Sequence, residues 1–394
     1  MEKHKAVILG ANYYIGLSAI RCLGSQGIPV TAVDYSQTDT YGFASKYCKE
    51  KLIAPHYKDH PLETISFLEE YGKKQELKPV LLPSADAYVE LMEPYYQRLR
   101  QYYLLPDTPP GLNTDLLNKA SLRELAQKHG VLTPETILPG EEGFYDRVEA
   151  EIGYPCLVKP FMSHSFVSKF RAKMFTVKNR EELQKALGRV EEAKLPVFVQ
   201  RIISGFDDHM YTFNAYLDQR GKVTHWMTCQ KQRQYPINFG ASVYTKQRYV
   251  PELFKIGAPF LEDVGFRGLA EIEFKKDARS GKFYLIEVNV RLSNLSSLFA
   301  KVGLNMPYIM YRDLTGNPLP PKKIVNDLEV YFWYAFEDLL AIRHYLKAGQ
   351  LTLGQVLESH FKPKAYAVWD SKDPLPALSF LKRKGKRLVN ALKR

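Results

Sequence analysis

The sequence predicts a mixed fold: an α/β N-terminal domain of the Rossmann-like type, followed by a larger α+β region. Residues 5–34 show a strand, a helix and a second strand, because two short apolar runs flank a helical segment. A linker rich in proline and glycine spans 106–111. From 211 to 246, aromatic and polar residues alternate with the period of β-strands. We therefore expect more than one folding unit.

The composition is that of an ordinary globular protein and excludes disordered and fibrous classes. Of 394 residues, 45% are hydrophobic and 25% are charged, and the formal net charge is +12. No run reaches the roughly 18 uninterrupted apolar residues that a membrane span needs. Cys22, Cys48, Cys156 and Cys229 are too scattered for a disulfide framework or a Cys-x-x-Cys metal site. These features predict a reducing, cytoplasmic environment.

The N-terminal domain is expected to hold a parallel sheet whose first loop does not bind a dinucleotide. This loop runs from Gly10 to Gly16 and departs from G-x-G-x-x-G, and the bulky Tyr13 and Tyr14 would block a pyrophosphate. A further apolar run, 80–82, ends in a polar loop that contains Asp86. Small ligands bind at this carboxyl edge of open parallel sheets.

Beyond the linker, the sequence predicts one capped helix and several short strands. The helix covers 113–130, with an asparagine or threonine cap and a terminal glycine. The strand-like runs are 156–159, 173–177 and 197–200, followed by the alternating stretch with a turn at 218–221. Residues after 321 have a helical pattern.

The most informative stretch is a pair of acidic strands, 271–274 and 284–291. Period-two alternation puts Glu271 and Glu273 on one face, and Glu287, Asn289 and Arg291 on one face of the next strand. A hairpin centred near 280 would place 273 opposite 287 and 271 opposite 289. Opposed carboxylates destabilise a strand pair unless a cation lies between them, and this oxygen-rich set suits Mg²⁺. The alternative is a solvent-facing polar strand whose register is slipped by one residue.

Five motifs resemble those of the ATP-grasp ligases in their order along the chain, if the two acidic strands are counted as one motif. The stretch 285–291 resembles the E-[VI]-N-P-R signature, and 268–274 resembles the strand before it. The others are Asn118-Lys119 with 130–134, the strand 154–160, the hinge at 198–203 and the run 231–236. The last of these resembles the K-x-R-Q-Y-P run of amino-acid-type carboxylate-amine ligases, the group that includes D-aspartate ligase. The resemblance covers roughly residues 1–310.

This resemblance implies an ATP-grasp fold of two subdomains after the N-terminal, pre-ATP-grasp domain. ATP and Mg²⁺, expected as a pair of ions, would lie between the subdomains. The expected boundaries are 1–112 for the Rossmann-like domain, 113–198 for the subdomain with the lid, 199–320 for the subdomain with the metal site, and 321–394 for a helical extension with a basic tail.

The resemblance also implies site residues. Lys119 and Lys159 would contact the ATP phosphates, and the glycine-poor lid loop 161–169 would use serines such as Ser165. The adenine would meet backbone groups of Gln200, Arg201 and Ile202, and the ribose would meet Asp207 or Asp208. The implied metal ligands are Glu273, Glu287 and Asn289. Four basic residues would hold the transferred phosphoryl group, the substrate carboxylate or the acyl phosphate: Lys231, Arg233, Arg267 and Arg291.

Ordinary structural roles are the alternatives for several of these residues. Lys119 is also compatible with a helix-surface lysine, and the two aspartates are compatible with turn caps. Arg267 is also compatible with a surface ion pair.

The predicted function is ligation of a carboxylate, as in an amino acid, to an amine, as in a peptide or cell-wall precursor. The γ-phosphate of ATP would activate the carboxylate as an acyl phosphate. One alternative is a carboxylase that uses bicarbonate in the same fold. Another is a nucleotide-regulated binding protein held at a membrane by its basic tail.

The C-terminal tail, 379–394, carries seven cations and no acid. Leu381, Leu388, Val389 and Leu392 fall near helical spacing, although Gly385 interrupts the helix. This pattern is typical of peripheral contact with an anionic membrane, or of a solvated helix that caps the domain. No interleaved aromatic pattern indicates nucleic acid, so the expected partners are small molecules.

Overall fold

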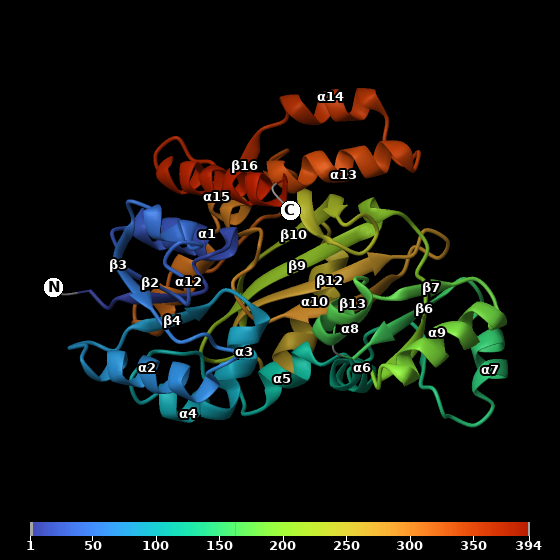
Figure 1. Cartoon of the computed structure of the whole chain (residues 1–394). Helices are drawn as coiled ribbons and strands as arrows, with labels where there is room; N and C mark the ends of the chain where they lie inside the picture. The colour runs from blue at the N-terminus through green and yellow to red at the C-terminus, as the bar shows by residue number, and fades with distance from the viewer. Residues whose placement is uncertain (1–2, 162, 393–394) are drawn as a thin grey trace.

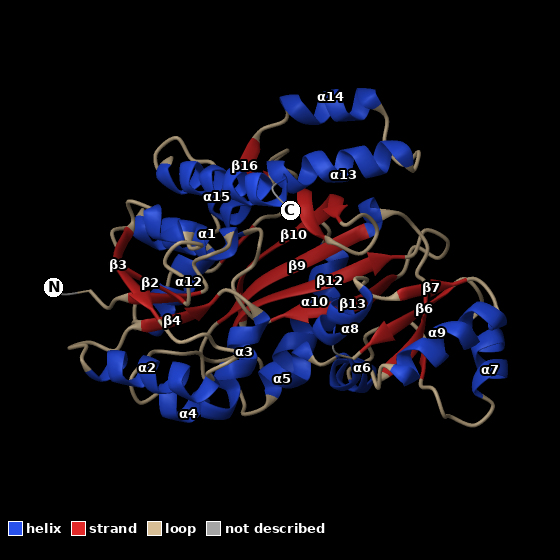
Figure 2. Ribbon diagram, in the orientation of Figure 1, coloured by secondary structure: helices blue, strands red, loops and turns tan. Residues whose placement is uncertain are grey.

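Three β-sheets, each covered by helices, make up the molecule (Figure 1). This is a computed structural model, and it describes residues 3–161 and 163–392, apart from the side chains of 163–165 and 387–392. Figure 2 shows the largest sheet in the middle, with the N-terminal sheet on one side and a small sheet on the other. The cleft between the large and the small sheet includes the predicted site residues Lys119, Lys159 and Gln200, which line a pocket there.

The N-terminal sheet is parallel, with strand order β3-β2-β1-β4, and confirms the predicted strand, helix and strand. Its strands are β1 (Ala6–Leu9), β2 (Val30–Asp34), β3 (Cys48–Ile53) and β4 (Val80–Pro83). Its helices are α1 (Tyr14–Gly24), α2 (Pro61–Lys73), α3 (Asp86–Met92) and α4 (Tyr96–Leu99). β1 and β2 are buried along their whole length, as the strands of a parallel sheet covered on both faces are. The edge strand β3 was not predicted, because charged residues interrupt its apolar pattern.

The small sheet is antiparallel, with order β5-β8-β6-β7. Its strands are β5 (Thr136–Ile137), β6 (Cys156–Pro160), β7 (Phe175–Val177) and β8 (Val197–Arg201), and its helices are α7 (Phe144–Arg147), α8 (Ser163–Phe170) and α9 (Arg180–Glu192). Two expectations are corrected here. The lid segment predicted as a loop is helical from 163, and the boundary drawn at 198 falls inside β8.

The single helix predicted over 113–130 is wrong, because the chain forms α5 (Leu112–Leu117) and α6 (Lys119–Lys128). Between them Asn118 is extended, with φ −81° and ψ 124°. Its Oδ1 accepts hydrogen bonds from the backbone N–H groups of Ala120 at 2.9 Å and Ser121 at 3.3 Å. Asn118 therefore caps the second helix and puts Lys119 at its first position.

The large sheet has order β13-β12-β9-β10-β11-β15-β16, with β14 paired to β10. Its strands are β9 (Met210–Leu217), β10 (Val223–Tyr235), β11 (Ala241–Gln247), β12 (Gly268–Lys276), β13 (Phe283–Asn289), β14 (Lys322–Lys323), β15 (Tyr331–Trp333) and β16 (Lys364–Tyr366). The associated helices are α10 (Pro251–Asp263), α11 (Ser296–Lys301) and α12 (Met306–Leu314). The predicted turn at 218–221 is present and closes with a bond from Gly221 N–H to the Asp218 carbonyl, 2.8 Å long.

The C-terminal extension after 321 was predicted to be helical, and this is only partly correct. The extension also adds β14, β15 and β16 to the large sheet. These strands have two or three residues each, too few to show a period in the sequence. Its helices are α13 (Ala335–Lys347), α14 (Leu353–Phe361) and α15 (Leu375–Leu392). Within residues 3–161 and 163–392, no helix is long and apolar enough to cross a membrane.

Helix α15 packs its inner face on the N-terminal domain and continues through Gly385. Phe380 is buried, with its ring 5.4 Å from the ring of Tyr41, and Arg383 donates to the Asp39 carbonyl. The first part of the tail therefore caps the domain. Leu381 is exposed, and the side chains of Leu388, Val389 and Leu392 lie outside the described part of the chain.

Replacing Asp373 by alanine should destabilise the protein by about 3–5 kcal/mol, because it leaves Arg21 buried without a counter-charge. Arg21 Nε lies 2.9 Å from Asp373 Oδ2, and Ser45 Oγ and Lys46 N–H also donate to this carboxylate. Urea unfolding measures the loss. In a matched control, Asp146→Ala breaks the exposed pair with Arg180 and should cost less than about 1 kcal/mol. Equal losses in the two variants would contradict the prediction.

Candidate functional site

The acidic hairpin has the predicted register. In the β12–β13 ladder Glu273 lies opposite Glu287, and Glu271 lies opposite Asn289. The slipped register is therefore wrong. The ladder shifts only after Glu273, so the irregularity falls beyond the two acidic pairs.

Cations from neighbouring elements compensate these carboxylates. Lys231, on β10, is fully buried, and its Nζ lies 2.7 Å from Glu273 Oε2. Arg291 donates to Asn289 Oδ1 at 2.9 Å and to Asp86 Oδ1 at 2.9 Å. Ser293 Oγ donates to Glu271 at 2.6 Å. Glu271 and Glu273 therefore lie in a network of hydrogen bonds and ion pairs.

Desolvation and mutual repulsion act on the acids of this network. Burial and the charge of Glu273 raise the pKa of Glu271 to about 7. Shielding from bulk water and the charge of Glu273 also raise the pKa of Glu287, although its side chain opens to the cleft. A further cation near Glu273 and Glu287 would relieve this repulsion.

The donor set fits a hard divalent ion. Glu273 and Glu287 offer facing carboxylates, and two residues beyond Glu287 Asn289 offers an amide oxygen that also accepts from Arg291. Among the described residues, no group of three or more His, Cys, Asp or Glu is arranged to hold a metal. An ion here would therefore need further oxygen ligands, such as the phosphate oxygens of a nucleotide.

Lys119 and Lys159 line a pocket between the small sheet and β13. Lys159 Nζ donates to Gln200 Oε1 at 2.9 Å, and Lys119 Nζ donates to the Pro160 carbonyl at 3.4 Å. Gln200 Nε2 donates to Thr136 Oγ1 at 3.1 Å. The apolar part of the pocket is formed by Leu122, Leu138, Phe161, Phe198, Leu285 and Ile286. Phe198, Leu285 and Ile286 belong to the motifs named above, but the sequence did not predict that their side chains line a pocket.

The two lysines and Glu287 lie close enough to affect one another electrostatically. Burial and the neighbouring charge of Lys119 lower the pKa of Lys159 to about 7, and Glu287 acts in the opposite direction. Desolvation lowers the pKa of Lys119 as well, against the effect of Glu287. The two lysines that are predicted to contact phosphate thus border the same cleft as the acidic hairpin.

Lys173, between α8 and β7, lies near enough to the acidic hairpin to interact with it electrostatically, and the sequence did not reveal this. Its Nζ donates to the Phe239 carbonyl at 2.9 Å. Desolvation lowers its pKa, while the charges of Glu287 and Glu273 raise it. The small sheet therefore brings a further ammonium group toward the acidic hairpin.

Arg233 does not join the site, contrary to prediction. Its guanidinium forms a bidentate ion pair with Asp338 of α13, at 2.6 and 2.7 Å, and both side chains are buried. The β10–β11 ladder is irregular on both sides of Arg233, so the period-two spacing from Lys231 does not hold. Arg233 fastens the C-terminal extension to the large sheet.

Asp207 is also corrected, because it is a buried structural acid. It accepts from Asn238 N–H at 2.8 Å and from the side chains of Gln234 and Tyr345. Asp208 is exposed and contacts His209 Nδ1 at 2.8 Å, so it alone of the pair stays open to a ribose.

Backbone contacts to adenine are restricted at the end of β8. Arg201 N–H already donates to the Glu135 carbonyl at 2.9 Å, and its guanidinium donates to Glu135 Oε1 at 3.0 Å. The cause is that β8 is an interior strand, paired with β5 on one side and β6 on the other. Ile202 follows the strand and remains a candidate, whereas the side chain of Ser165 lies outside the described residues.

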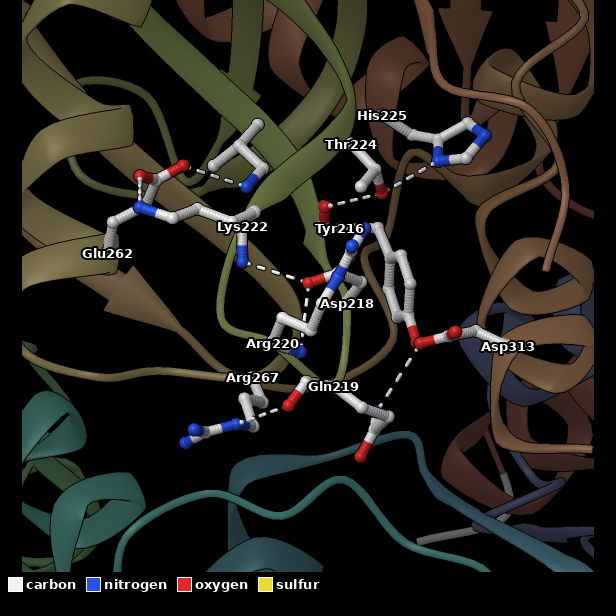
Figure 3. Close-up of polar contacts among 11 residues, drawn as sticks. Tyr216, Asp218, Gln219, Arg220, Lys222, Thr224, His225, Glu262, Arg267 and Asp313 are labelled. Atoms are coloured by element: carbon white, nitrogen blue, oxygen red, sulfur yellow. Dashed lines mark hydrogen bonds and ion pairs between the residues drawn. The ribbon is translucent and has the colours of Figure 1, made fainter. Parts of the chain in front are cut away.

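Arg267 holds backbone segments together, as Figure 3 shows for its bond to the turn at 218–221. Its guanidinium donates to the carbonyls of Gln219 at 2.9 Å, Asp107 at 3.0 Å and Gly265 at 3.1 Å. Asp107 lies in the linker that follows the N-terminal domain. We therefore assign Arg267 a structural role in place of the predicted acyl-phosphate contact and the alternative surface ion pair.

Comparison with known proteins bears on this cleft. Residues 119–321 match the family described as the carbamoyl-phosphate synthase L chain, ATP binding domain. A D-aspartate ligase from Enterococcus faecium (strain Aus0004) is 30% identical over an alignment of 261 residues, which covers 63% of this chain and 61% of that protein. The match thus spans less than two thirds of the length of this curated relative.

Solved structures share the fold. The N5-carboxyaminoimidazole synthetase from Staphylococcus aureus superposes with a TM-score of 0.63 at 15% identity, over 83% of this chain and 81% of that one. The biotin carboxylase domain of the 2-oxoglutarate carboxylase from Hydrogenobacter thermophilus, in complex with MgADP, ADP and bicarbonate, gives 0.61 at 16% identity, over 84% and 74%. These similarities confirm the predicted fold class.

Replacing Lys231 by methionine should destabilise the protein by about 3–5 kcal/mol in EDTA, because Glu273 loses its buried partner. Adding Mg²⁺ should restore more stability to this variant than to the wild type, since the ion replaces the lost charge. Thermal unfolding with and without Mg²⁺ measures both effects. The matched control is Lys231→Met with Glu273→Gln, which should be more stable in EDTA than the single variant and should gain little from Mg²⁺. A single variant that is insensitive to Mg²⁺ would contradict the metal assignment.

Proposed function

Because the chain belongs to the ATP-grasp family of the carbamoyl-phosphate synthase L chain ATP-binding domain, we propose that it joins a carboxylate to an amine at the expense of ATP. The observation that carries this proposal is the convergence of Lys119, Lys159 and the Glu273–Glu287 pair on one cleft. The 30% identity to a D-aspartate ligase supports an amino acid as the carboxylate substrate. The acceptor, in this proposal, is the amine of a peptide or cell-wall precursor.

In the proposed reaction the nucleotide lies between the two sheets. Its base occupies the apolar pocket beside Phe198 and Ile286, and its phosphates lie against Lys159 and Lys119. The ammonium groups offset phosphate charge without covalent chemistry, which is what phosphoryl transfer chiefly requires. Mg²⁺, as a pair of ions held by Glu273, Glu287 and Asn289, would neutralise charge on the phosphate oxygens.

Two displacements complete the reaction. A substrate carboxylate oxygen attacks the γ-phosphorus, the bond to the bridging oxygen breaks, and ADP leaves. The amine nitrogen then attacks the acyl carbon, phosphate leaves with the electrons of the carbon–oxygen bond, and the amine loses a proton. In this proposal Arg291, which is held by Asp86 of the N-terminal domain, binds the anionic substrate group. Lys231 and Lys173 add positive charge on the same side.

Substrate-dependent ADP release tests the function. A ligase releases ADP only when a carboxylate and an amine are both present, and a screen of D- and L-amino acids identifies the carboxylate. ADP release that requires bicarbonate would identify a carboxylase instead. Nucleotide binding without ADP release under any of these conditions would identify a binding protein.

Replacing Glu287 by glutamine should abolish Mg²⁺-dependent turnover while leaving the fold intact, because the side chain keeps its size but loses the charge that faces Glu273. ADP release and thermal unfolding are measured together. Glu70→Gln, an exposed acid on α2, is the control and should leave both unchanged. Near-normal turnover in folded Glu287→Gln protein would refute the assignment of Glu287 as a ligand.

Replacing Lys159 by methionine should weaken ATP binding at least about tenfold near pH 6.5, about 1.4 kcal/mol. The wild-type affinity should also fall as pH rises above about 7, since burial lowers the pKa of Lys159 to about 7 from the ordinary 10.5. Bound phosphate would raise the pKa of Lys159, so ATP binding is coupled to uptake of a proton by Lys159 when the pH is above about 7. Calorimetric titration at pH 6.5, 7.5 and 8.5 measures both effects.

The Lys159→Met protein should lack this decline between pH 7 and 9. The control is Lys185→Met, an exposed lysine on α9 that pairs with Glu181. It should bind ATP as the wild type does. An unchanged affinity and pH profile in the Lys159→Met protein would leave Lys159 a structural residue.

A further inference from the structure

Helix α14 turns its polar side toward the protein. Gln355, Glu358 and Ser359, with Lys362 after the helix end, line a groove against Arg233, Tyr244 and Tyr345. Ser359 accepts from Arg233 Nη2 through its Oγ at 3.4 Å, and from Tyr244 OH through its carbonyl oxygen at 3.0 Å. Polar contacts therefore hold this helix in place.

The apolar stripe of α14 faces solvent. Leu353, Leu357 and Phe361 are 68%, 63% and 87% exposed. Successive residues of a helix are rotated by about 100° around its axis, so these three side chains fall within an arc of about 80°. The centre of this arc lies about 150° around the helix axis from the centre of the groove-lining residues. Helices on a protein surface normally direct such a stripe to the core, so α14 is inverted.

The neighbouring helices add apolar and basic residues to the same end of the molecule, the upper part of Figure 1. The inner face of α13 is buried through Ala341, Ile342 and Tyr345, while its outer face exposes Phe336, Leu339, Leu340, Arg343 and Lys347. The inner face of α15 is buried through Ala377 and Phe380, while its outer face exposes Leu375, Leu378, Leu381, Lys382 and Lys386.

The described acids of these helices lie away from the exposed apolar rows. Asp338 is buried against Arg233, and Glu337 is half-buried and near Lys384 and Lys173. Glu358 lies on the groove side of α14, and its carboxylate is 3.0 Å from Lys362 Nζ. The outward rows of the described side chains are therefore leucine and phenylalanine bordered by cations.

We propose that this end of the molecule docks on an anionic membrane surface, with the α14 stripe inserted at the headgroup boundary. Exposed apolar rows flanked by lysine and arginine match the composition of interfacial membrane helices. The cations complement the phosphates of anionic lipids. A protein partner would fit less well, because lysine is depleted in protein interfaces relative to the rest of the surface. Docking thus involves all three helices of the C-terminal extension rather than the tail alone.

Co-sedimentation of the full chain with vesicles tests the proposal. The chain should bind vesicles of phosphatidylcholine mixed with phosphatidylglycerol at low salt, release as salt rises, and stay in the supernatant with phosphatidylcholine alone. The triple variant Leu353→Gln, Leu357→Gln and Phe361→Gln should reduce the bound fraction at least about tenfold. Its melting temperature should not change, because the replaced side chains are exposed.

A matched control replaces exposed apolar residues elsewhere, as Ile53→Gln, Leu62→Gln and Leu328→Gln, and should bind vesicles like the wild type. A second variant, Lys382→Glu with Lys386→Glu, should weaken binding at low salt. The proposal is overturned if the wild type does not bind anionic vesicles, or if the α14 variant binds them equally well. It is also overturned if the wild type forms dimers that the α14 variant abolishes, since the face would then be a protein interface.

Discussion

Opposed carboxylates on β12 and β13 are the constraint around which the cleft is organised. Glu273 faces Glu287 across the ladder, and Glu271 follows on the same face. Facing like charges destabilise a strand pair, so the hairpin depends on cations supplied by other elements. Lys231 reaches Glu273 from β10, across the intervening strand β9. The central strands of the sheet and the candidate metal site are therefore energetically coupled.

Charge pairs also position the parts of the chain around the cleft. Arg291 links the acidic hairpin to Asp86, at the start of α3 in the N-terminal domain. Arg21 and Asp373 tie the C-terminal extension to the N-terminal domain. A buried pair such as Arg21–Asp373 contributes little net stability, but removing one partner is costly, so it favours one arrangement over its alternatives. The partly exposed Arg291–Asp86 pair adds a link between the N-terminal domain and the candidate metal site.

The features that could be predicted from the sequence are those that depend on residues close together along the chain. Strand alternation and a short connection were enough to place Glu273 opposite Glu287, and an apolar strand ending in lysine marked Lys159. The roles of Arg233, Asp207 and Arg201 depend on Asp338, Tyr345 and Glu135, which lie 105, 138 and 66 residues away along the chain. No spacing rule connects such partners. The sequence did not predict the break at Asn118 between helices α5 and α6, because an asparagine within a helical pattern is also compatible with one continuous helix.

The orientation of α14 shows the same limit at the level of a whole helix. A periodic sequence predicts that a helix has two faces, but only tertiary contacts decide which face turns inward. Here the irregular ladder that removes Arg233 from the cleft also presents its guanidinium to Asp338 and Ser359 of the C-terminal extension. These contacts, with the bond from Tyr244 OH to the Ser359 carbonyl, hold the polar side of α14 against the large sheet. The apolar stripe is left outward, and the arginine that is absent from the cleft is one of the residues that contact the inward side of this helix.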